Sequence, residues 1–76
     1  MVSQVGITTE YIKLDQLLKF CGAASTGSEA KELILAGMVL VNGTPCQMRG
    51  KKLRPGDRIV VKGRDYEVAA GGNQPD

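Results

Sequence analysis

The sequence contains no histidine and no tryptophan, and its aromatic residues are limited to Tyr11, Phe20 and Tyr66. Histidine is both the most frequent general base and the commonest metal ligand, so its absence argues against catalysis and against a zinc site. The two cysteines, Cys21 and Cys46, belong to no C-x-x-C motif. We therefore expect no metal, no cofactor and no enzymatic activity.

Long hydrophobic runs are also missing. No stretch approaches the roughly 20 apolar residues of a membrane-spanning helix, and the first residues lack the basic and apolar segments of a signal peptide. These features predict a cytoplasmic protein with no membrane partner. With 76 residues, of which 42% are hydrophobic and 24% charged, the chain is typical of one small globular domain with little room for a deep substrate cleft.

Positive charge is unevenly distributed along the chain. Residues 1–38 carry three basic and four acidic residues, whereas residues 39–76 carry seven basic and four acidic residues. The seven basic residues all lie between positions 49 and 64, and four of them fall within six positions: Arg49, Lys51, Lys52 and Arg54. Such a cluster attracts phosphate groups, and the alternative interpretation is a solvated loop.

Two short helices are predicted in the first half of the chain. Leucines at positions 14, 17 and 18 share a helical face with Cys21, and Gly22 is placed to end that helix. Thr26 and Glu29 fit a capping box that begins a second helix, which Gly37 is expected to end. The short connection between them predicts a compact helical hairpin, with Phe20 and Tyr11 in the core.

The second half of the chain is predicted to form strands. Asn42-Gly43 is a strong signal for a two-residue hairpin turn after residues 38–41, and Arg54-Pro55-Gly56-Asp57 fits a type II turn. A further hairpin is expected over residues 58–69, turning around Gly63-Arg64. Before the helices, residues 1–6 are expected to be frayed and residues 7–12 to form a first short strand.

The order of these predicted helices, turns and strands resembles that of a known family. The residues that carry the resemblance are Lys13-Leu14-Asp15, Ser25-Thr26, Ala30-Lys31, Ile34, Gly37, Val39, Val41-Asn42-Gly43, Pro55-Gly56-Asp57 and Ile59. Over residues 11–61 the chain resembles the S4 RNA-binding domain, above all its stand-alone bacterial form. The resemblance implies an α+β fold, in which an αL-type two-helix RNA-binding motif packs on a small bent antiparallel sheet. We expect an N-terminal extension that includes the start of the first strand over 1–10, the S4-like domain over 11–70, and a disordered tail over 71–76.

The resemblance also implies an RNA-binding face. The residues of this face are those that match the family position by position, together with the basic loop, by which we mean residues 49–54. They are Lys13, Thr26, Gly27, Lys31, Asn42, Gly43, Arg49, Lys51, Lys52 and Arg54. Gly27 departs from the larger family, which usually places an arginine there. The change removes a fork-shaped phosphate donor, but it leaves room for a phosphate to approach the beginning of the second helix.

The function implied is docking of structured RNA, either ribosomal RNA or tRNA. Because exposed aromatic rings are scarce, we expect recognition by shape and phosphate contacts and not by base stacking. The expected partners extend to the ribosome or its assembly intermediates, with the chain acting as a monomer in ribosome assembly or translation. Two alternatives stay open: a protein-interaction module, and a ubiquitin-like sulfur carrier that would use Gly71-Gly72, although Asn73–Asp76 follow that pair.

Overall fold

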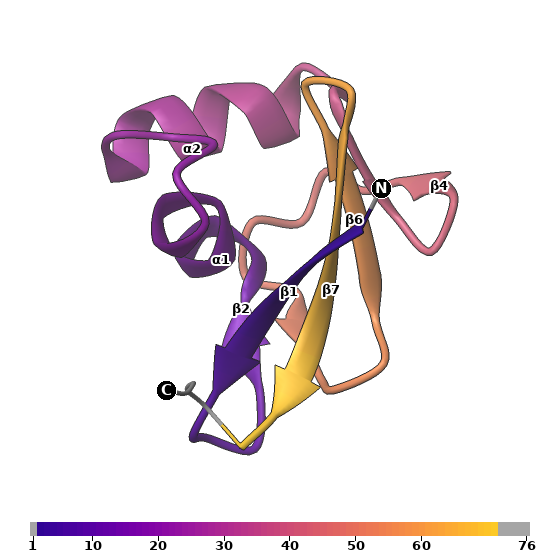
Figure 1. Ribbon diagram of the computed structural model, residues 1–76. Helices are drawn as coiled ribbons and strands as arrows, with labels where there is room; N and C mark the ends of the chain where they lie inside the picture. Colours follow the sequence, from indigo (N-terminus) through magenta and orange to yellow (C-terminus); the bar gives the residue numbers. More distant parts are fainter. Residues whose placement is uncertain (1, 72–76) are drawn as a thin grey trace.

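The computed structural model describes residues 2–71. Two helices pack on one side of a twisted five-stranded sheet, and a small two-stranded ladder lies beside the first helix (Figure 1). The helices are α1 (Leu14–Phe20) and α2 (Gly27–Leu35). The strands are β1 (Val2–Ile7), β2 (Ile12–Lys13), β3 (Val39–Val41), β4 (Thr44–Pro45), β5 (Lys52–Leu53), β6 (Arg58–Val61) and β7 (Arg64–Ala70). The predicted α+β fold is confirmed.

The first helix follows its apolar pattern. Leu14, Leu17 and Leu18 are fully buried, and Cys21 caps the end of α1 as a half-buried free thiol. Gly22 then adopts a φ of +84°, in the left-handed region that favours glycine. Neither helix among the described residues is long and apolar enough to cross a membrane.

The second helix begins at the predicted cap. The Thr26 hydroxyl accepts a hydrogen bond from the Glu29 backbone N–H at 3.1 Å. The Glu29 carboxylate returns a bond, but it accepts from the N–H of Ser25 at 2.8 Å, one residue before the cap. Ala30 and Ile34 provide the buried stripe of α2. The capping box is therefore confirmed, with its return bond displaced by one residue.

The main sheet has the strand order β1-β7-β6-β3-β4. Asn42 and Gly43 have φ values of 52° and 86°, as the predicted two-residue turn between β3 and β4 requires. Gly56 has a φ of 101°, and the Asp57 N–H donates to the Arg54 carbonyl at 3.0 Å, which confirms the type II turn before β6.

Other predictions about the strands are wrong. The N-terminal residues expected to be frayed form β1, and β1 pairs parallel to β7, so the sheet is mixed and not purely antiparallel. The strand expected over residues 7–12 is interrupted by bends at 8–10, and only Ile12 continues, in the separate β2–β5 ladder. Because Val61 pairs with Arg64, the last turn consists of Lys62 and Gly63, one residue earlier than predicted. Residues 72–76 of the predicted tail lie outside the described residues.

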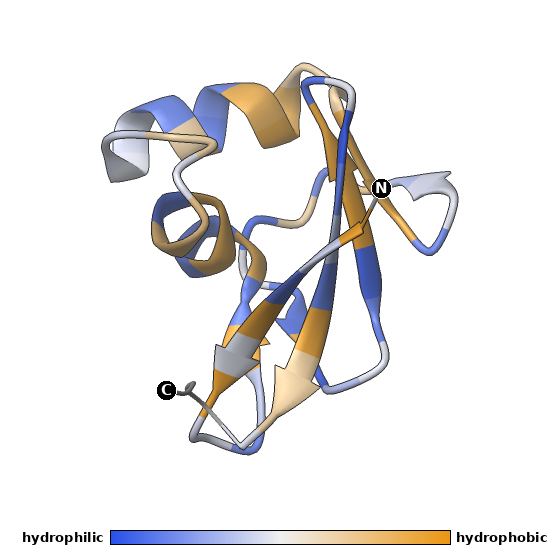
Figure 2. Ribbon diagram, in the orientation of Figure 1, coloured by the Kyte–Doolittle hydropathy of each residue, from blue (hydrophilic) through white to orange (hydrophobic). Residues whose placement is uncertain are grey.

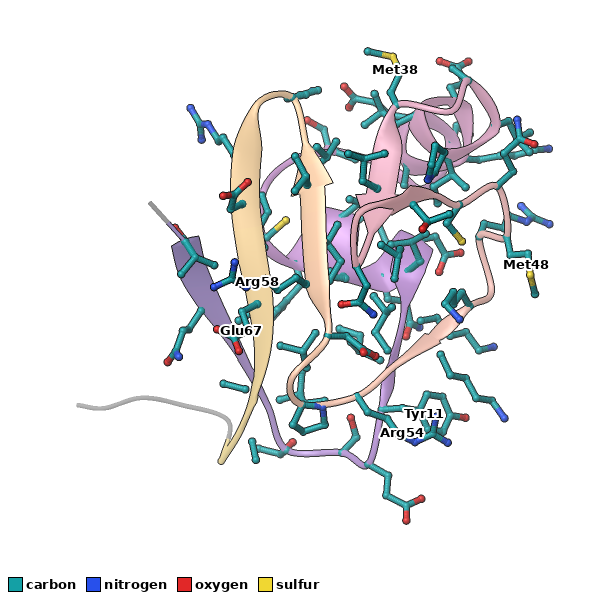
Figure 3. All side chains as sticks on the ribbon, turned by 90° about the vertical axis from the view of Figure 1, so that its right-hand side faces the viewer. Tyr11, Met38, Met48, Arg54, Arg58 and Glu67 are labelled. Carbon is teal, nitrogen blue, oxygen red and sulfur yellow. The ribbon has the colours of Figure 1, made fainter. Side chains whose placement is uncertain are left out.

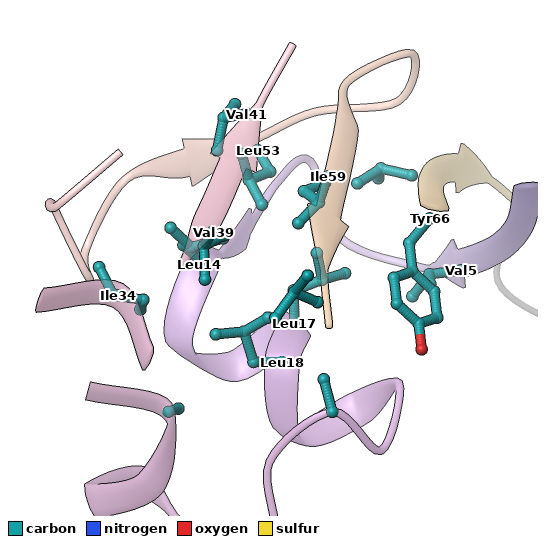
Figure 4. Packing of buried hydrophobic residues seen from close by; sticks show 14 of the residues in the cluster. Val5, Leu14, Leu17, Leu18, Ile34, Val39, Val41, Leu53, Ile59 and Tyr66 are labelled. Carbon is teal, nitrogen blue, oxygen red and sulfur yellow. The ribbon is translucent and has the colours of Figure 1, made fainter. Parts of the chain in front are cut away.

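The core lies between the helices and the sheet. Apolar residues face one another across this interface (Figures 2 and 4), and the largest fully buried ones are Leu14, Leu17, Leu18, Ile34, Val39, Leu53, Ile59, Val61 and Val68. Phe20 is not among them: it is 65% exposed, since it lies off the leucine stripe of α1. Tyr11 is only half-buried. The expectation that both belong to the core is wrong for Phe20 and only partly right for Tyr11.

Candidate nucleic-acid interface

The two-stranded ladder brings distant basic residues together. Strands β2 and β5 pair antiparallel, with Ile12 opposite Leu53 and Lys13 opposite Lys52. Like charges that face each other across a ladder destabilise it. The pairing persists because Leu53 is buried in the core, which fixes the register.

The basic loop is also tied to the beginning of α1 through its backbone. The Leu14 N–H donates to the Lys51 carbonyl at 2.9 Å, and the Asp15 N–H donates to the Arg49 carbonyl at 3.1 Å. These bonds satisfy two of the free N–H groups of the helix. They also hold the loop backbone in one place, so its side chains extend from a fixed support.

Tyr11 lies beside this ladder. The Lys52 ammonium lies 5.0 Å from the centroid of the Tyr11 ring, which is a cation–π contact. Continuing the β2–β5 register places Arg54 next to Tyr11, and Figure 3 shows the two residues together at one end of the molecule. No pattern in the sequence indicates this contact, because Tyr11 and Lys52 are more than 40 positions apart.

Five of the predicted residues therefore surround the β2–β5 ladder and the beginning of α1. We call Lys13, Arg49, Lys51, Lys52 and Arg54 the basic cluster. Lys51 is half-buried and the other four are exposed. Across residues 2–71 the one ion pair joins Lys62 to Glu29, so no carboxylate in that part of the chain forms an ion pair with the cluster. An unpaired cluster of this kind attracts a polyanion.

The other predicted residues on helices lie elsewhere. Thr26 and Gly27 are exposed at the beginning of α2 and Lys31 is exposed in its middle, and Figure 1 shows α2 on the other side of α1 from β2. The space around Gly27 is open, because a Cβ added there meets no atom within 4 Å. No hydrogen bond or ion pair found among residues 2–71 joins this group to the basic cluster. Their RNA contacts remain predictions.

The beginning of α2 is instead held by the β6–β7 turn. The Lys62 ammonium donates to the Ala23 carbonyl at 2.8 Å and lies 3.7 Å from a Glu29 carboxylate oxygen. The Ser25 N–H, and after it the charge of Lys62, hold the pKa of Glu29 below its ordinary value. The sequence did not indicate this role of Lys62.

Asn42 has a structural role in the turn. Its amide nitrogen donates to the Asp57 carboxylate at 3.2 Å, and its amide oxygen accepts from the Arg58 N–H at 3.0 Å. Gly43 supplies the positive φ of the turn. The turn thus explains both residues without a ligand, and the contact with RNA stays a prediction for Asn42 and Gly43.

A groove of about 430 Å³ connects this turn to the basic cluster. It lies between β4 and the loop that follows, and residues around it include Asn42, Pro45, Cys46, Met48 and Lys51. No group of three or more metal-ligating side chains occurs within the described part of the chain. The groove therefore offers apolar surface next to a lysine.

The chain belongs to the S4 domain family, because residues 5–69 match the family model of the S4 domain. It is 38% identical over 63 residues to the probable ribosome maturation protein RlbA of Bacillus subtilis, a match that covers 83% of this chain and 89% of that protein.

Ribosomal proteins give a second group of matches. The chain is 32% identical over 62 residues to small ribosomal subunit protein uS4 of Anaeromyxobacter sp. strain K, and 34% identical over 56 residues to that of Aquifex aeolicus. These matches cover 82% and 74% of this chain but only 30% and 26% of the ribosomal proteins. The chain is thus similar in size to the maturation protein and to one part of uS4.

Proposed function

We propose that this chain binds structured RNA, either ribosomal RNA or tRNA, through the basic cluster and acts in ribosome assembly or translation. The observation that carries the proposal is the pairing of Lys13 with Lys52, which places two lysines that form no ion pair within residues 2–71 on adjacent strands. A phosphate backbone supplies the missing negative charge. Membership of the S4 family and similarity to proteins named for ribosome maturation and the small subunit support the same function.

The mechanism is electrostatic docking on a rigid support. The β2–β5 ladder and the two backbone bonds to α1 fix where the cluster presents its charges. If about five phosphates are neutralised on duplex-like RNA, the affinity falls with salt at a log–log slope on the order of −4. The chain acts on RNA as one copy and without catalysis.

The experiment is a salt titration of RNA binding with two variants of equal charge. Lys51→Ala combined with Lys52→Ala is expected to weaken binding to all structured RNAs by about one to two orders of magnitude near 0.1 M salt, and to flatten the slope by about 2. Lys19→Ala combined with Arg64→Ala removes the same charge from exposed positions outside the cluster. It is expected to keep nearly the parental slope. A cluster variant with the parental affinity and slope would overturn the assignment.

The identity of the RNA is tested in cells. Ultraviolet crosslinking of the parent, followed by sequencing of the RNA attached to it, distinguishes ribosomal RNA from tRNA. The double variant in the basic cluster serves as the background control, because it is expected to lose about half of the phosphate contacts. Enrichment of neither RNA over this control would contradict a role in ribosome assembly or translation.

The two alternatives have less support. The helical hairpin and the family assignment favour RNA binding over a ubiquitin-like sulfur carrier. The carrier also needs a terminal Gly-Gly carboxylate, and Gly72 lies outside the described residues. A protein-interaction module would have to meet the basic cluster with acidic side chains, and it would show no preference for RNA over an acidic peptide.

A further inference from the structure

We propose that the groove beside Lys51 holds one unpaired nucleotide of the bound RNA. The inference rests on the proposed function and adds to it a structural feature of the target, a bulged or looped-out base. It starts from Met48, which is 66% exposed and stands two residues after the half-buried Cys46. A single exposed methionine needs no explanation, but this one forms a wall of the groove together with Pro45 and Cys46.

The size of the groove limits what it holds. Its volume of about 430 Å³ lies toward the small end of sites that bind small molecules, which span roughly 300–1,000 Å³. A single nucleotide is of a size that such a groove can accept. Base-paired RNA cannot enter, because its bases are stacked inside the duplex, whereas unpaired bases in loops and bulges are available.

The chemistry of the groove matches the two halves of a nucleotide. Lys51 both lines the groove and belongs to the basic cluster, so its ammonium can neutralise the phosphate of the nucleotide whose base enters. Within residues 2–71, no acidic side chain lines the groove. Methionine sulfur makes favourable contacts with aromatic rings and adapts to different shapes, so Met48 provides a contact surface for the base although no exposed aromatic ring lies there.

The groove has little to distinguish one base from another. The Asn42 amide already donates to Asp57, and the Gln47 amide donates to the Leu35 carbonyl at 3.0 Å. Thr44 supplies the hydroxyl on the lining. We therefore expect the groove to select unpaired over paired nucleotides, with affinities for the four bases within about threefold of one another, since specific readout depends on well-placed hydrogen bonds.

The test uses two RNA hairpins that differ in one position. One is fully paired, and the other carries a single bulged 2-aminopurine, a fluorescent adenine analogue. The parent is expected to bind the bulged hairpin about three to ten times more tightly and to change the fluorescence of the bulge. Met48→Ala is expected to bring the two affinities close together. Met38→Ala is the matched control, because Met38 is 55% exposed and lies outside the groove lining.

The rate of cysteine alkylation reports directly on whether the groove is occupied. Cys46 lines it, whereas Cys21 does not, and both are half-buried free thiols. The bulged hairpin is expected to slow alkylation of Cys46 by iodoacetamide, with Cys21 as the internal reference in the same peptide digest. Equal affinity for both hairpins, with unchanged Cys46 alkylation, would overturn the groove proposal and leave RNA binding intact. Failure of both hairpins to bind would overturn the proposed function as well.

Discussion

Tyr11 gives a flexible lysine a preferred position. A lysine side chain on a surface strand samples many rotamers, and fixing it on a ligand costs conformational entropy. The half-buried ring of Tyr11 holds the Lys52 ammonium at 5.0 Å before any ligand arrives. The ring also stands next to Arg54 in the continued register, so one aromatic residue organises part of the basic cluster.

A double-mutant cycle on this pair measures its value for RNA binding. Tyr11→Leu is expected to weaken RNA binding by about two- to fivefold, since an exposed cation–π contact contributes about 0.5–1 kcal/mol. In the background of Lys52→Ala the same change is expected to have little further effect, because the contact is already lost. Tyr11→Phe keeps a ring and is the control. Fluorescence anisotropy gives the affinities, and strictly additive effects would show that Tyr11 does not position Lys52.

At the scale of elements, the beginning of α2 is held by a small polar network. Thr26 caps the helix, Glu29 binds the Ser25 N–H, and Lys62 joins this turn to the β6–β7 hairpin. Lys62 has a φ of 54°, a conformation rare for lysine. Its bonds to Ala23 and Glu29 lock the turn onto the helix pair, which offsets the cost of that backbone conformation.

The network makes stability depend on pH. The pKa of Glu29 lies below its ordinary value of 4.5 in the folded chain, so the ionised carboxylate stabilises the folded state above that pH. This contribution is lost as the pH falls through the lower, folded value. Glu29→Gln is therefore expected to be less stable than the parent at pH 7, and the difference is expected to shrink as the pH is lowered to about 3. Urea denaturation at both pH values measures it.

The matched control for this prediction is Glu32→Gln. Glu32 lies on the same helix, is exposed and belongs to no ion pair among residues 2–71. Its substitution is expected to leave the pH dependence of stability unchanged. A constant difference in stability between the parent and Glu29→Gln at both pH values would mean that the charge of Glu29 has no stabilising role.

Local signals predicted those elements whose cause is local. The Thr26 cap, the Asn42-Gly43 turn and the glycine of the type II turn each depend on a few neighbouring residues, and all three are confirmed. The β2–β5 ladder depends on two residues from each of two distant segments, so no pattern in the sequence reveals it. The basic residues of the candidate site were identified from their types, but their grouping around that ladder required the structure.

At the scale of the whole molecule, β1 brings the first described residues of the chain beside the last strand, β7. This strand forms one edge of the main sheet and pairs only with β7, near the other end of the described chain. Its Val-Ser-Gln-Val-Gly-Ile sequence has a weak strand signal, because two consecutive polar residues interrupt the apolar–polar alternation and glycine is disfavoured in strands. The pairing therefore depends on tertiary contacts. Val5 and Ile7 are buried in the core, and this burial stabilises the strand beside β7.

A substitution at Ile7 tests whether β1 contributes to the free energy of unfolding of the domain. A domain of this size has a free energy of unfolding of only about 4–11 kcal/mol, so each core contact matters. Ile7→Ala is expected to lower it by about 2–4 kcal/mol, because the side chain is 6% exposed. Ser3→Ala, on an exposed position of the same strand, is expected to stay within about 0.5 kcal/mol of the parent. Urea denaturation distinguishes the two. If Ile7→Ala were as stable as Ser3→Ala, β1 would be a frayed extension after all, because a strand that is dispensable for packing adds no free energy of unfolding.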